Sequence, residues 1–349
     1  MIETLQAILP YISGLYTLPW IVIGFIATII IARFTGREKI DQAMKKVGLI
    51  LLYFFIPLLL FRIFISTTFG TKQIQFSLIV AAIILFMYVL AYLYAKYQMK
   101  KQHMSADKKI LYLKTLLTNQ GRSSAFIGSA MMAFWQLEAG IFMALVGIAL
   151  FAIMPYILSQ LHKKEIKKNE TNKNPLPWFL KLYPWYLISF VLAAVLLHGP
   201  GGVTINWNES YPFLVKFYTA ITIPAALYYV GAGIHPSDLK ISEIKKLLGL
   251  DTTDKSDHWI WVRNMFVLTV IITPLLIGVI FAPLYIYQII PGSWFAVIFI
   301  NAVLPVTSTN MFLLPYGIDK RSTAHIVTWT TLICVPIVVA LIALFDLYL

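Results

Sequence analysis

Long apolar runs separated by short polar connections dominate this chain. A helix that crosses the roughly 30 Å of bilayer hydrocarbon needs about 20 consecutive, mainly apolar residues. Ten segments meet that requirement, so the pattern predicts an all-α integral membrane protein with ten transmembrane helices. The predicted spans are 15–35, 47–69, 74–97, 111–135, 138–161, 178–199, 213–235, 259–283, 294–315 and 323–347.

Composition agrees with this pattern. Of the 349 residues, 59% are hydrophobic and 12% are charged. A soluble domain needs about 25% charged residues to cover its surface, so most of this surface is expected to face lipid. The net charge of +13 comes largely from lysines in the connections, which argues against nucleic acid as a partner. The single cysteine, Cys334, lies in an apolar run and excludes a disulfide framework, and the first residues lack the basic region of a cleaved signal peptide.

Basic residues alternate between successive connections. The odd-numbered connections are basic, whereas among the even-numbered ones only the second carries a basic residue, Lys72. Because cytoplasmic connections carry the excess of lysine and arginine, both termini are predicted to lie outside. We therefore expect a multi-pass protein of the plasma membrane, surrounded by membrane lipids.

A polar linker divides the chain into halves of five predicted spans each. The linker, 162–177, follows a first repeat at 1–161 and precedes a second at 178–349. An odd number of spans per half makes related halves an inverted repeat. Both halves have a mid-span proline, Pro57 in the second span and Pro224 in the seventh, and polar interruptions in the fourth and ninth spans. Chance recurrence of these features is the alternative.

The fourth and ninth spans are the candidate binding site because polar residues interrupt both. At bilayer depth, polar groups and non-helical backbone are tolerated only inside protein or along a cavity. Interrupted helices at matching positions of two repeats indicate a transporter's binding site. The predicted substrate-binding residues are Asn119, Arg122, Ser123, Ser124, Gly128, Ser129, Thr307, Ser308, Thr309 and Asn310, and the predicted structural prolines are Pro57, Pro224 and Pro305.

Arg122 indicates the class of ligand. It lies well inside the fourth span, while acidic residues lie in connections or at span ends, as Glu138 and Asp346 do. A buried arginine without an internal carboxylate favours an anion, and its planar fork suits a carboxylate or a phosphate. The alternative is that Arg122 extends toward the interface or binds carbonyls freed by the helix break. Arg62, near the outer end of the second span, is expected to snorkel.

Coupling to a proton or to sodium is expected to use carbonyls, hydroxyls or the substrate's own proton, because no carboxylate lies deep in a predicted span. His198 and His325 lie at span ends without metal-ligand spacing, so no metal or other cofactor is predicted. The sequence also lacks the metalloprotease, serine-hydrolase and phosphate-loop motifs, which argues against an enzyme. A receptor or sensor is a further alternative, disfavoured by the absence of a soluble effector domain.

Two stretches carry a family resemblance. Residues 302–338, AVLPVTSTNMFLLPYGIDKRSTAHIVTWTTLICVPIV, combine a leucine-proline, a tyrosine-bearing turn and a threonine-rich final span that ends at a proline. In the fourth span, IGSAMMAFW contains Gly128 but has Ala130 where a proline is typical, and Ser123 falls at an asparagine position with Asn119 one turn earlier. The sequence thereby resembles the auxin efflux carrier family, which includes the plant PIN-FORMED carriers, within the bile-acid/auxin transporter superfamily.

That resemblance implies two inverted five-span repeats with broken helices that cross near Gly128–Ala130 and Thr307–Asn310, Ala130 being a hinge position. It implies a transport bundle of spans 3–5 and 8–10, and a scaffold of spans 1, 2, 6 and 7 that also forms a homodimer contact. The implied function is a permease that moves a small organic anion by alternating access. A sodium-coupled symporter of the bile-acid type is the alternative.

Overall fold

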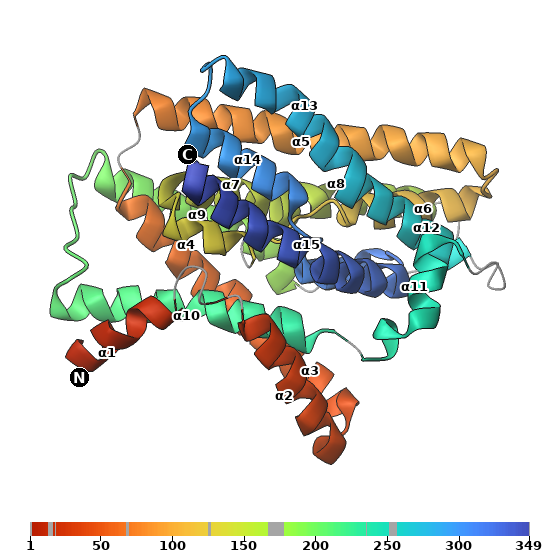
Figure 1. Cartoon of the computed structure of the whole chain (residues 1–349), viewed down its shortest axis with the longest axis horizontal. Helices are drawn as coiled ribbons and strands as arrows, with labels where there is room; N and C mark the ends of the chain where they lie inside the picture. The colour runs from red at the N-terminus through yellow and green to blue at the C-terminus, as the bar shows by residue number, and fades with distance from the viewer. Residues whose placement is uncertain are drawn as a thin grey trace. The chain divides into compact units, whose positions relative to one another are not determined.

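The protein is all-helical in its computed structural model (Figure 1). The structure describes residues 2–12, 17, 19–67, 70–124, 127–166, 178–234, 236–250 and 257–348. Helix accounts for 85% of the described residues, and no β-strand occurs within these ranges. Most of the predicted linker, residues 167–177, lies outside the described residues.

The helical elements follow one another along the chain with short connections. The α-helices are α1 (Ile2–Ile8), α2 (Trp20–Thr35), α3 (Arg37–Ile50), α4 (Ile56–Ile65), α5 (Thr71–Lys101), α6 (Ala106–Thr118), α7 (Gln136–Ile148), α8 (Met154–Ile166), α9 (Trp178–His198), α10 (Ser210–Ala232), α11 (Ile241–Leu248), α12 (Asp257–Phe266), α13 (Thr273–Ile286), α14 (Gly292–Val303) and α15 (Lys320–Tyr348). Short 3-10 helices are η1 (Leu9–Ile12), η4 (Gly128–Ala133), η6 (Pro236–Leu239) and η8 (Ser308–Tyr316), and π-helical segments are η3 (Leu51–Phe55), η5 (Ala149–Ile153) and η7 (Val267–Ile272).

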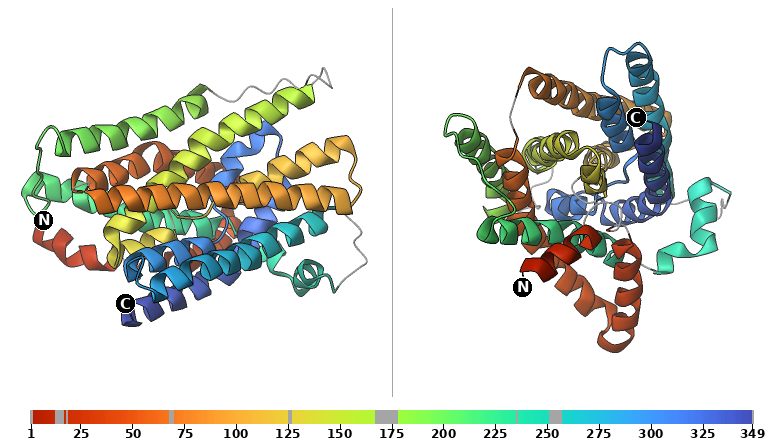
Figure 2. Two further views of the ribbon diagram at one scale, coloured as in Figure 1. Left: turned by 90° about the horizontal axis from the view of Figure 1, so that it is seen from above. Right: turned by 60° about the vertical axis from the view of Figure 1, so that its left-hand side comes forward.

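Several helices have the length and composition of membrane spans, which agrees with an integral membrane protein. Among the described residues, five are long and apolar enough to cross a bilayer, and α5 is seen along its full length in Figure 2. Four of the remaining predicted spans contain shorter apolar helices, and the ten-span count stays a prediction. The five long helices are Arg37–Ile65, Thr71–Lys101, Tyr211–Ala232, Asp257–Ile286 and Lys320–Tyr348. The shorter apolar helices are Trp20–Thr35, Gln136–Ile148, Trp185–His198 and Gly292–Val303.

Each π-helical segment is followed by a proline at the second position of the next helix. These prolines are Pro57 in α4, Pro155 in α8 and Pro274 in α13. A proline inside a helix has no N–H to donate and its ring collides with the carbonyl four residues earlier. Widening that turn into a π-helix accommodates the ring while the helix continues. Pro224, by contrast, lies inside α10, which runs without a break.

Contacts divide the chain into two compact units. Unit 1 contains Met1–Ser77, Ser124–Ala144 and Trp185–His235, and unit 2 contains Leu78–Ser123, Leu145–Pro184 and Pro236–Leu349. The predicted division into two sequence repeats is a different partition, and it stays a prediction.

In unit 1, α2 and α10 approach closely at two glycines. A Cβ atom on Gly24 would lie 2.2 Å from the Tyr228 carbonyl oxygen, and one on Gly231 would lie 1.9 Å from the Ile21 carbonyl oxygen. Neither collision can be relieved by rotating a side chain, because the opposing atoms are backbone. The absence of a side chain at both positions therefore sets the distance between these helices.

Arg62 forms hydrogen bonds to a neighbouring helix, whereas the sequence predicts that its side chain snorkels toward the membrane surface. Its Nη1 donates to the carbonyl oxygen of Lys216 at 2.6 Å and to Oγ1 of Thr219 at 2.7 Å. Both acceptors belong to α10, so Arg62 joins α4 to α10 within unit 1. The reason is local: the Thr219 hydroxyl and a backbone carbonyl lie within reach of the guanidinium.

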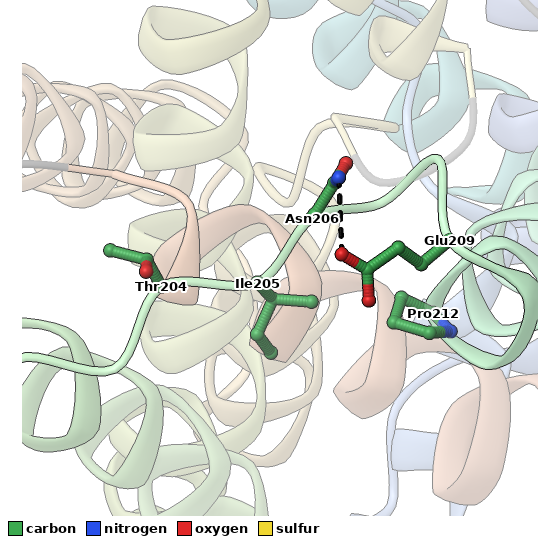
Figure 3. A pocket seen from close by; sticks show the side chains of 5 residues that line it. All are labelled: Thr204, Ile205, Asn206, Glu209 and Pro212. Atoms are coloured by element: carbon green, nitrogen blue, oxygen red, sulfur yellow. Dashed lines mark hydrogen bonds between the residues drawn. The ribbon is translucent and has the colours of Figure 1, made fainter.

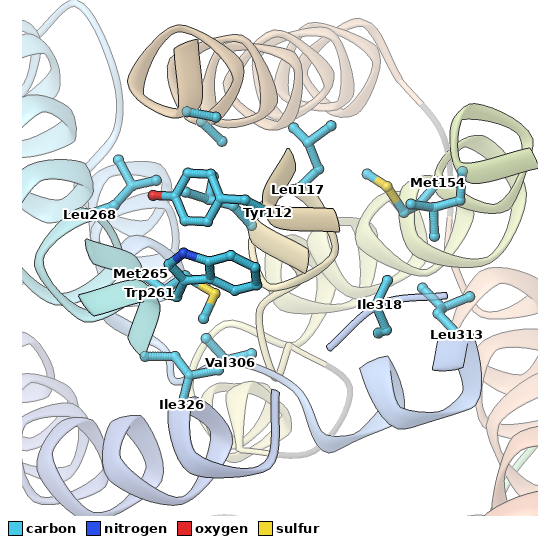
Figure 4. Close-up of a cluster of buried hydrophobic side chains, with 14 of the residues drawn as sticks. Tyr112, Leu117, Met154, Trp261, Met265, Leu268, Val306, Leu313, Ile318 and Ile326 are labelled. Atoms are coloured by element: carbon cyan, nitrogen blue, oxygen red, sulfur yellow. The ribbon is translucent and has the colours of Figure 1, made fainter. Parts of the chain in front are cut away.

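Unit 2 has a hydrophobic core built from α5, α6, α8, α12, η8 and α15 (Figure 4). The rings of Tyr112 and Trp261 lie 5.3 Å apart at its centre and are tilted by 54°. Val306, from the break after α14, belongs to the same core and is 1% exposed. The core therefore fixes the position of that break.

Candidate functional site

Two interrupted helices of unit 2 meet at a short antiparallel pairing, here called the crossing and defined as Gly121–Ser123 paired with Pro305–Thr307. Arg122 and Val306 form a β-bridge. The Ser123 N–H donates to the Pro305 carbonyl at 2.9 Å, and the Thr307 N–H donates to the Gly121 carbonyl at 2.9 Å. These bonds satisfy backbone groups that the interrupted helices leave free, as burial requires.

The second break follows from Pro305. A residue before proline is pushed out of the α region, and Leu304 accordingly has φ −52° and ψ 144° after α14. The freed Val306 N–H donates to Oγ1 of Thr330 at 3.1 Å. Beyond the crossing, η8 starts with Thr307 as its cap, whose Oγ1 accepts the Thr309 N–H at 3.4 Å.

The first break has no proline and depends on Asn119 and Gly121. Asn119 leaves the helical region with ψ 12° and ends α6. Gly121 then passes close to its neighbours: a Cβ there would lie 2.8 Å from Leu150 Cδ1 and 3.0 Å from Asn310 Oδ1. A side chain at this position would therefore separate the two segments.

Two asparagines join the two breaks. Nδ2 of Asn310 donates to Oδ1 of Asn119 at 3.4 Å. Nδ2 of Asn119 in turn donates to the Thr115 carbonyl at 2.8 Å and to Oγ1 of Thr323 at 3.1 Å. Both asparagines are fully buried, so they hold α6, η8 and α15 together at the crossing.

Arg122 is buried at the crossing without a matching negative charge. Its side chain is 3% exposed, and one guanidinium nitrogen donates to the Thr269 carbonyl at 3.3 Å. Nε and Nη1 have no hydrogen-bond partner among the described residues. The open N–H groups of Arg122 are suited to an anion, because a buried cation is costly unless it is paired.

Other polar atoms of unit 2 share this state: they are buried, and no partner for them lies within the described ranges. A protein tolerates few such atoms unless a ligand or water completes them. They include Thr118 Oγ1, Gln120 Oε1, Ser123 Oγ, Thr269 Oγ1, Ser308 Oγ, Asn310 Oδ1 and Thr331 Oγ1.

Lys114 is a buried cation that the sequence reasoning missed. It is 0% exposed, and its Nζ donates to the Tyr316 carbonyl at 3.0 Å. Tyr316 ends η8, where cations are favourable because helix carbonyls concentrate there. Lys114 and Arg122 are the buried charged side chains of the part of the chain described. The signal available in the sequence was a lysine inside a predicted span.

The structure brings together seven of the predicted residues and places three in unit 1. The seven in unit 2, at the crossing and the start of η8, are Asn119, Arg122, Ser123, Thr307, Ser308, Thr309 and Asn310. Ser124, which is buried, begins the next segment of unit 1, where Gly128, Ser129 and Ala130 lie in η4. The backbone pairing thus involves Gly121–Ser123 rather than the implied Gly128–Ala130, because Asn119 and Gly121 end α6 first and Gly128 starts a new helix.

A surface hollow of about 550 Å³ in unit 1 does not involve any predicted site residue (Figure 3). It lies in the connection before α10, where Asn206 Nδ2 donates to Glu209 Oε1 at 3.2 Å. Thr204, Asn206 and Glu209 are exposed, so this hollow lacks the desolvated charge of the crossing.

Asp319 is a half-buried carboxylate next to the crossing. Its backbone N–H donates to Oγ1 of Thr115 at 2.9 Å, and its Oδ2 accepts the Ser322 N–H at 2.8 Å. Burial would raise the pKa of this carboxyl, but interactions with His258 and Ser322 outweigh burial and hold the pKa at about 2. Asp319 lies in the connection before α15, and the sequence alone indicates no functional role for a carboxylate there.

The low pKa of Asp319 predicts acid sensitivity. Since an unpaired aspartate titrates near pH 4, the ionised carboxylate stabilises the fold fully above that value, and this contribution is lost as pH falls from about 4 to 2. The melting temperature of the wild type should fall more steeply over that range than that of Asp319→Asn. Thermal unfolding in detergent at pH 2–7 measures this, with the exposed Asp346→Asn as control. Parallel curves for wild type and Asp319→Asn would contradict it.

A scan of protein-family models finds no match to this chain, and a search of curated proteins finds none either.

Proposed function

We propose that this chain is a secondary active transporter that moves a small organic anion across the membrane by alternating access. The observation that carries the proposal is the Arg122 guanidinium, which is buried at a crossing of two interrupted helices with Nε and Nη1 open. A carboxylate accepts charge-assisted hydrogen bonds from such guanidinium N–H groups.

The proposed architecture has ten spans in two inverted five-span repeats, both termini outside and a homodimer in the plasma membrane. The helical, apolar chain supports the membrane location, the pairing of the two breaks supports the interrupted helices, and the alternating charge of the connections supports the orientation of the termini. Most helices of the two units agree with a scaffold and a moving bundle: α2, α4 and α10 belong to unit 1, and α6, α12, α14 and α15 belong to unit 2, whereas most of α7, from the predicted fifth span, belongs to unit 1. Rocking of one bundle against another is a recognised basis of alternating access.

A carboxylate binding and exchange experiment tests this function. Purified protein is screened by thermal shift against gluconate, succinate and benzoate, with glucose, succinamide and benzamide as uncharged controls. A ligand that binds the folded state raises its melting temperature. Binders are then tested as labelled solutes for counterflow into proteoliposomes, with and without sodium and against protein-free liposomes.

We expect at least one carboxylate to raise the melting temperature of the protein and to be exchanged across the membrane. None of its uncharged analogues should do either. A requirement for sodium would favour the bile-acid type of symporter. Binding without counterflow would favour a receptor or sensor, and neither binding nor counterflow would overturn the proposed function.

A further inference from the structure

A histidine–carboxylate pair lies at the start of two helices in unit 2. His258 is the second residue of α12, and Asp319 immediately precedes α15. His258 Nδ1 is 3.9 Å from Asp319 Oδ2 and 2.9 Å from Ser322 Oγ. The two side chains are 10% and 29% exposed, so the pair is shielded but not sealed from water.

Hydrogen bonds connect this pair to the crossing. The Thr323 hydroxyl donates to the Asp319 carbonyl at 2.8 Å and accepts from Asn119 Nδ2 at 3.1 Å. Asn119 then accepts from Asn310 Nδ2 at 3.4 Å. These hydrogen bonds link the start of α15 to Asn119, which ends α6, and to Asn310 in η8.

Helix capping explains only part of this arrangement. Asp319 accepts the N–H of Ser322, which is the ordinary role of an aspartate before a helix. Capping requires no histidine, and it does not account for His258 Nε2, which is buried with no hydrogen-bond partner among the described residues. An imidazole beside a carboxylate, with one ring nitrogen open, is the arrangement of a group that gains and loses a proton.

We propose that His258 and Asp319 form the proton-binding site of this protein, and that the proton bound there is coupled to movement of the anion at the crossing. The coupling half of this inference rests on the proposed function. The proton adds to an imidazole nitrogen of His258, and Asp319 stays ionised and stabilises the imidazolium.

Protonation of His258 changes which hydrogen-bond partners the pair needs. An imidazolium donates from both nitrogens, and Nε2 has no acceptor in the described conformation. The protonated site therefore favours a conformation in which Nε2 finds an acceptor. Because α12 and α15 pack against each other and α15 is bonded to Asn119, that preference biases the crossing.

Other charged groups around His258 are engaged mainly with one another. Asp257 pairs with Lys108 of α6, and Glu243 pairs with Lys246 of α11. Arg263 donates to the Lys246 carbonyl at 3.2 Å. The ring of His325 lies 5.0 Å from that of His258, and its Nδ1 lies 2.9 Å from the Arg321 carbonyl oxygen. Lys320 and Arg321 are exposed.

Trp259 offers a readout of proton binding that needs no substrate. Its ring lies 5.3 Å from His258 and 5.1 Å from His325, and a protonated imidazole at that distance quenches indole fluorescence. The difference between wild type and Trp259→Phe isolates this tryptophan from the others. We expect the fluorescence of this tryptophan to change with pH. This transition should be lost in His258→Gln and altered in Asp319→Asn, which keeps the helix cap but removes the charge.

Coupling is tested in the same proteoliposomes with labelled succinate or gluconate and an imposed pH gradient. Wild type should accumulate the anion severalfold above equilibrium, whereas His258→Gln and Asp319→Asn should exchange it but lose at least about three-quarters of that accumulation. His325→Gln and the distant His198→Gln serve as controls that should retain it.

The outcomes separate the two proposals. A wild type that exchanges no carboxylate sinks the proposed function, while the fluorescence transition still decides whether His258 binds a proton. Gradient-driven accumulation that persists in His258→Gln, or a transition lost only in His325→Gln, overturns the inference. If His258→Gln and Asp319→Asn both fail to fold or to exchange, the pair is a structural element and the inference is also overturned.

Discussion

Replacing Arg122 with glutamine is expected to weaken carboxylate binding at least thirtyfold. Removing one partner of a desolvated charge pair costs about 2–5 kcal/mol, and every 1.4 kcal/mol is a factor of ten in affinity. The estimate applies because Nε and Nη1 are the open donors of a side chain that is 3% exposed. Thermal-shift titration with the carboxylate that binds wild type measures the change.

Arg122→Gln should also leave the protein as stable as wild type or more stable. Among the described residues the guanidinium makes one hydrogen bond, at 3.3 Å, and is otherwise desolvated, so its removal relieves a cost. If Arg122 served only to bind carbonyls freed by the helix break, the variant would instead lose stability and keep its affinity. The carboxylate affinity of Arg122→Lys should lie between those of wild type and Arg122→Gln, because lysine retains the charge but lacks the planar guanidinium.

Arg263→Gln is the matched control in the same unit. Arg263, like Arg122, donates to a backbone carbonyl and has a buried Nε without a partner. Arg263 lies on α12, outside the crossing, and its acceptor is Lys246 on α11. Carboxylate affinity should therefore be unchanged in Arg263→Gln. An equal loss of affinity in both variants would show that the effect is not specific to the crossing.

The sequence predicts the helical class and the second break well, because these depend on short-range physics. A proline at position 305 forces Leu304 out of the helical region regardless of its surroundings. Polar residues in an apolar segment must likewise be buried in protein, which explains why Asn119 and Asn310 are recognisable without a structure.

The register of the crossing depends on packing between distant segments, which the sequence does not reveal. The resemblance implied Gly128–Ala130 as the first segment, whereas the backbone pairing involves Gly121–Ser123. Gly121 fits there because Leu150 and Asn310 occupy the space around it. Lys114 and the His258–Asp319 pair were missed for the same reason: their partners lie far away in the sequence.

Introducing a side chain at Gly121 is expected to disrupt the crossing. Gly121 has ordinary backbone angles, so the effect arises from space alone: a Cβ would lie 2.8 Å from Leu150 Cδ1 and 3.0 Å from Asn310 Oδ1. Overpacking a tight interior costs about 1–3 kcal/mol. We expect Gly121→Ala at the lower end of that range and Gly121→Val at the upper end, as measured by thermal unfolding, with severalfold weaker carboxylate binding in both. Gly70→Ala, on the exposed approach to α5, is the control.

Leu150 and Asn310 make separable contributions to this effect. Leu150 presents the end of a flexible side chain, which can rotate away, whereas Asn310 is held by its bond to Asn119 at 3.4 Å. If the contact with Leu150 dominates, Leu150→Val should restore stability to Gly121→Ala, and a double-mutant cycle should give a coupling of about 0.5–3 kcal/mol. If displacement of Asn310 dominates, Leu150→Val should restore nothing and the loss of carboxylate binding should persist. A Gly121→Val protein with wild-type stability and affinity would mean that the two segments do not pair as described.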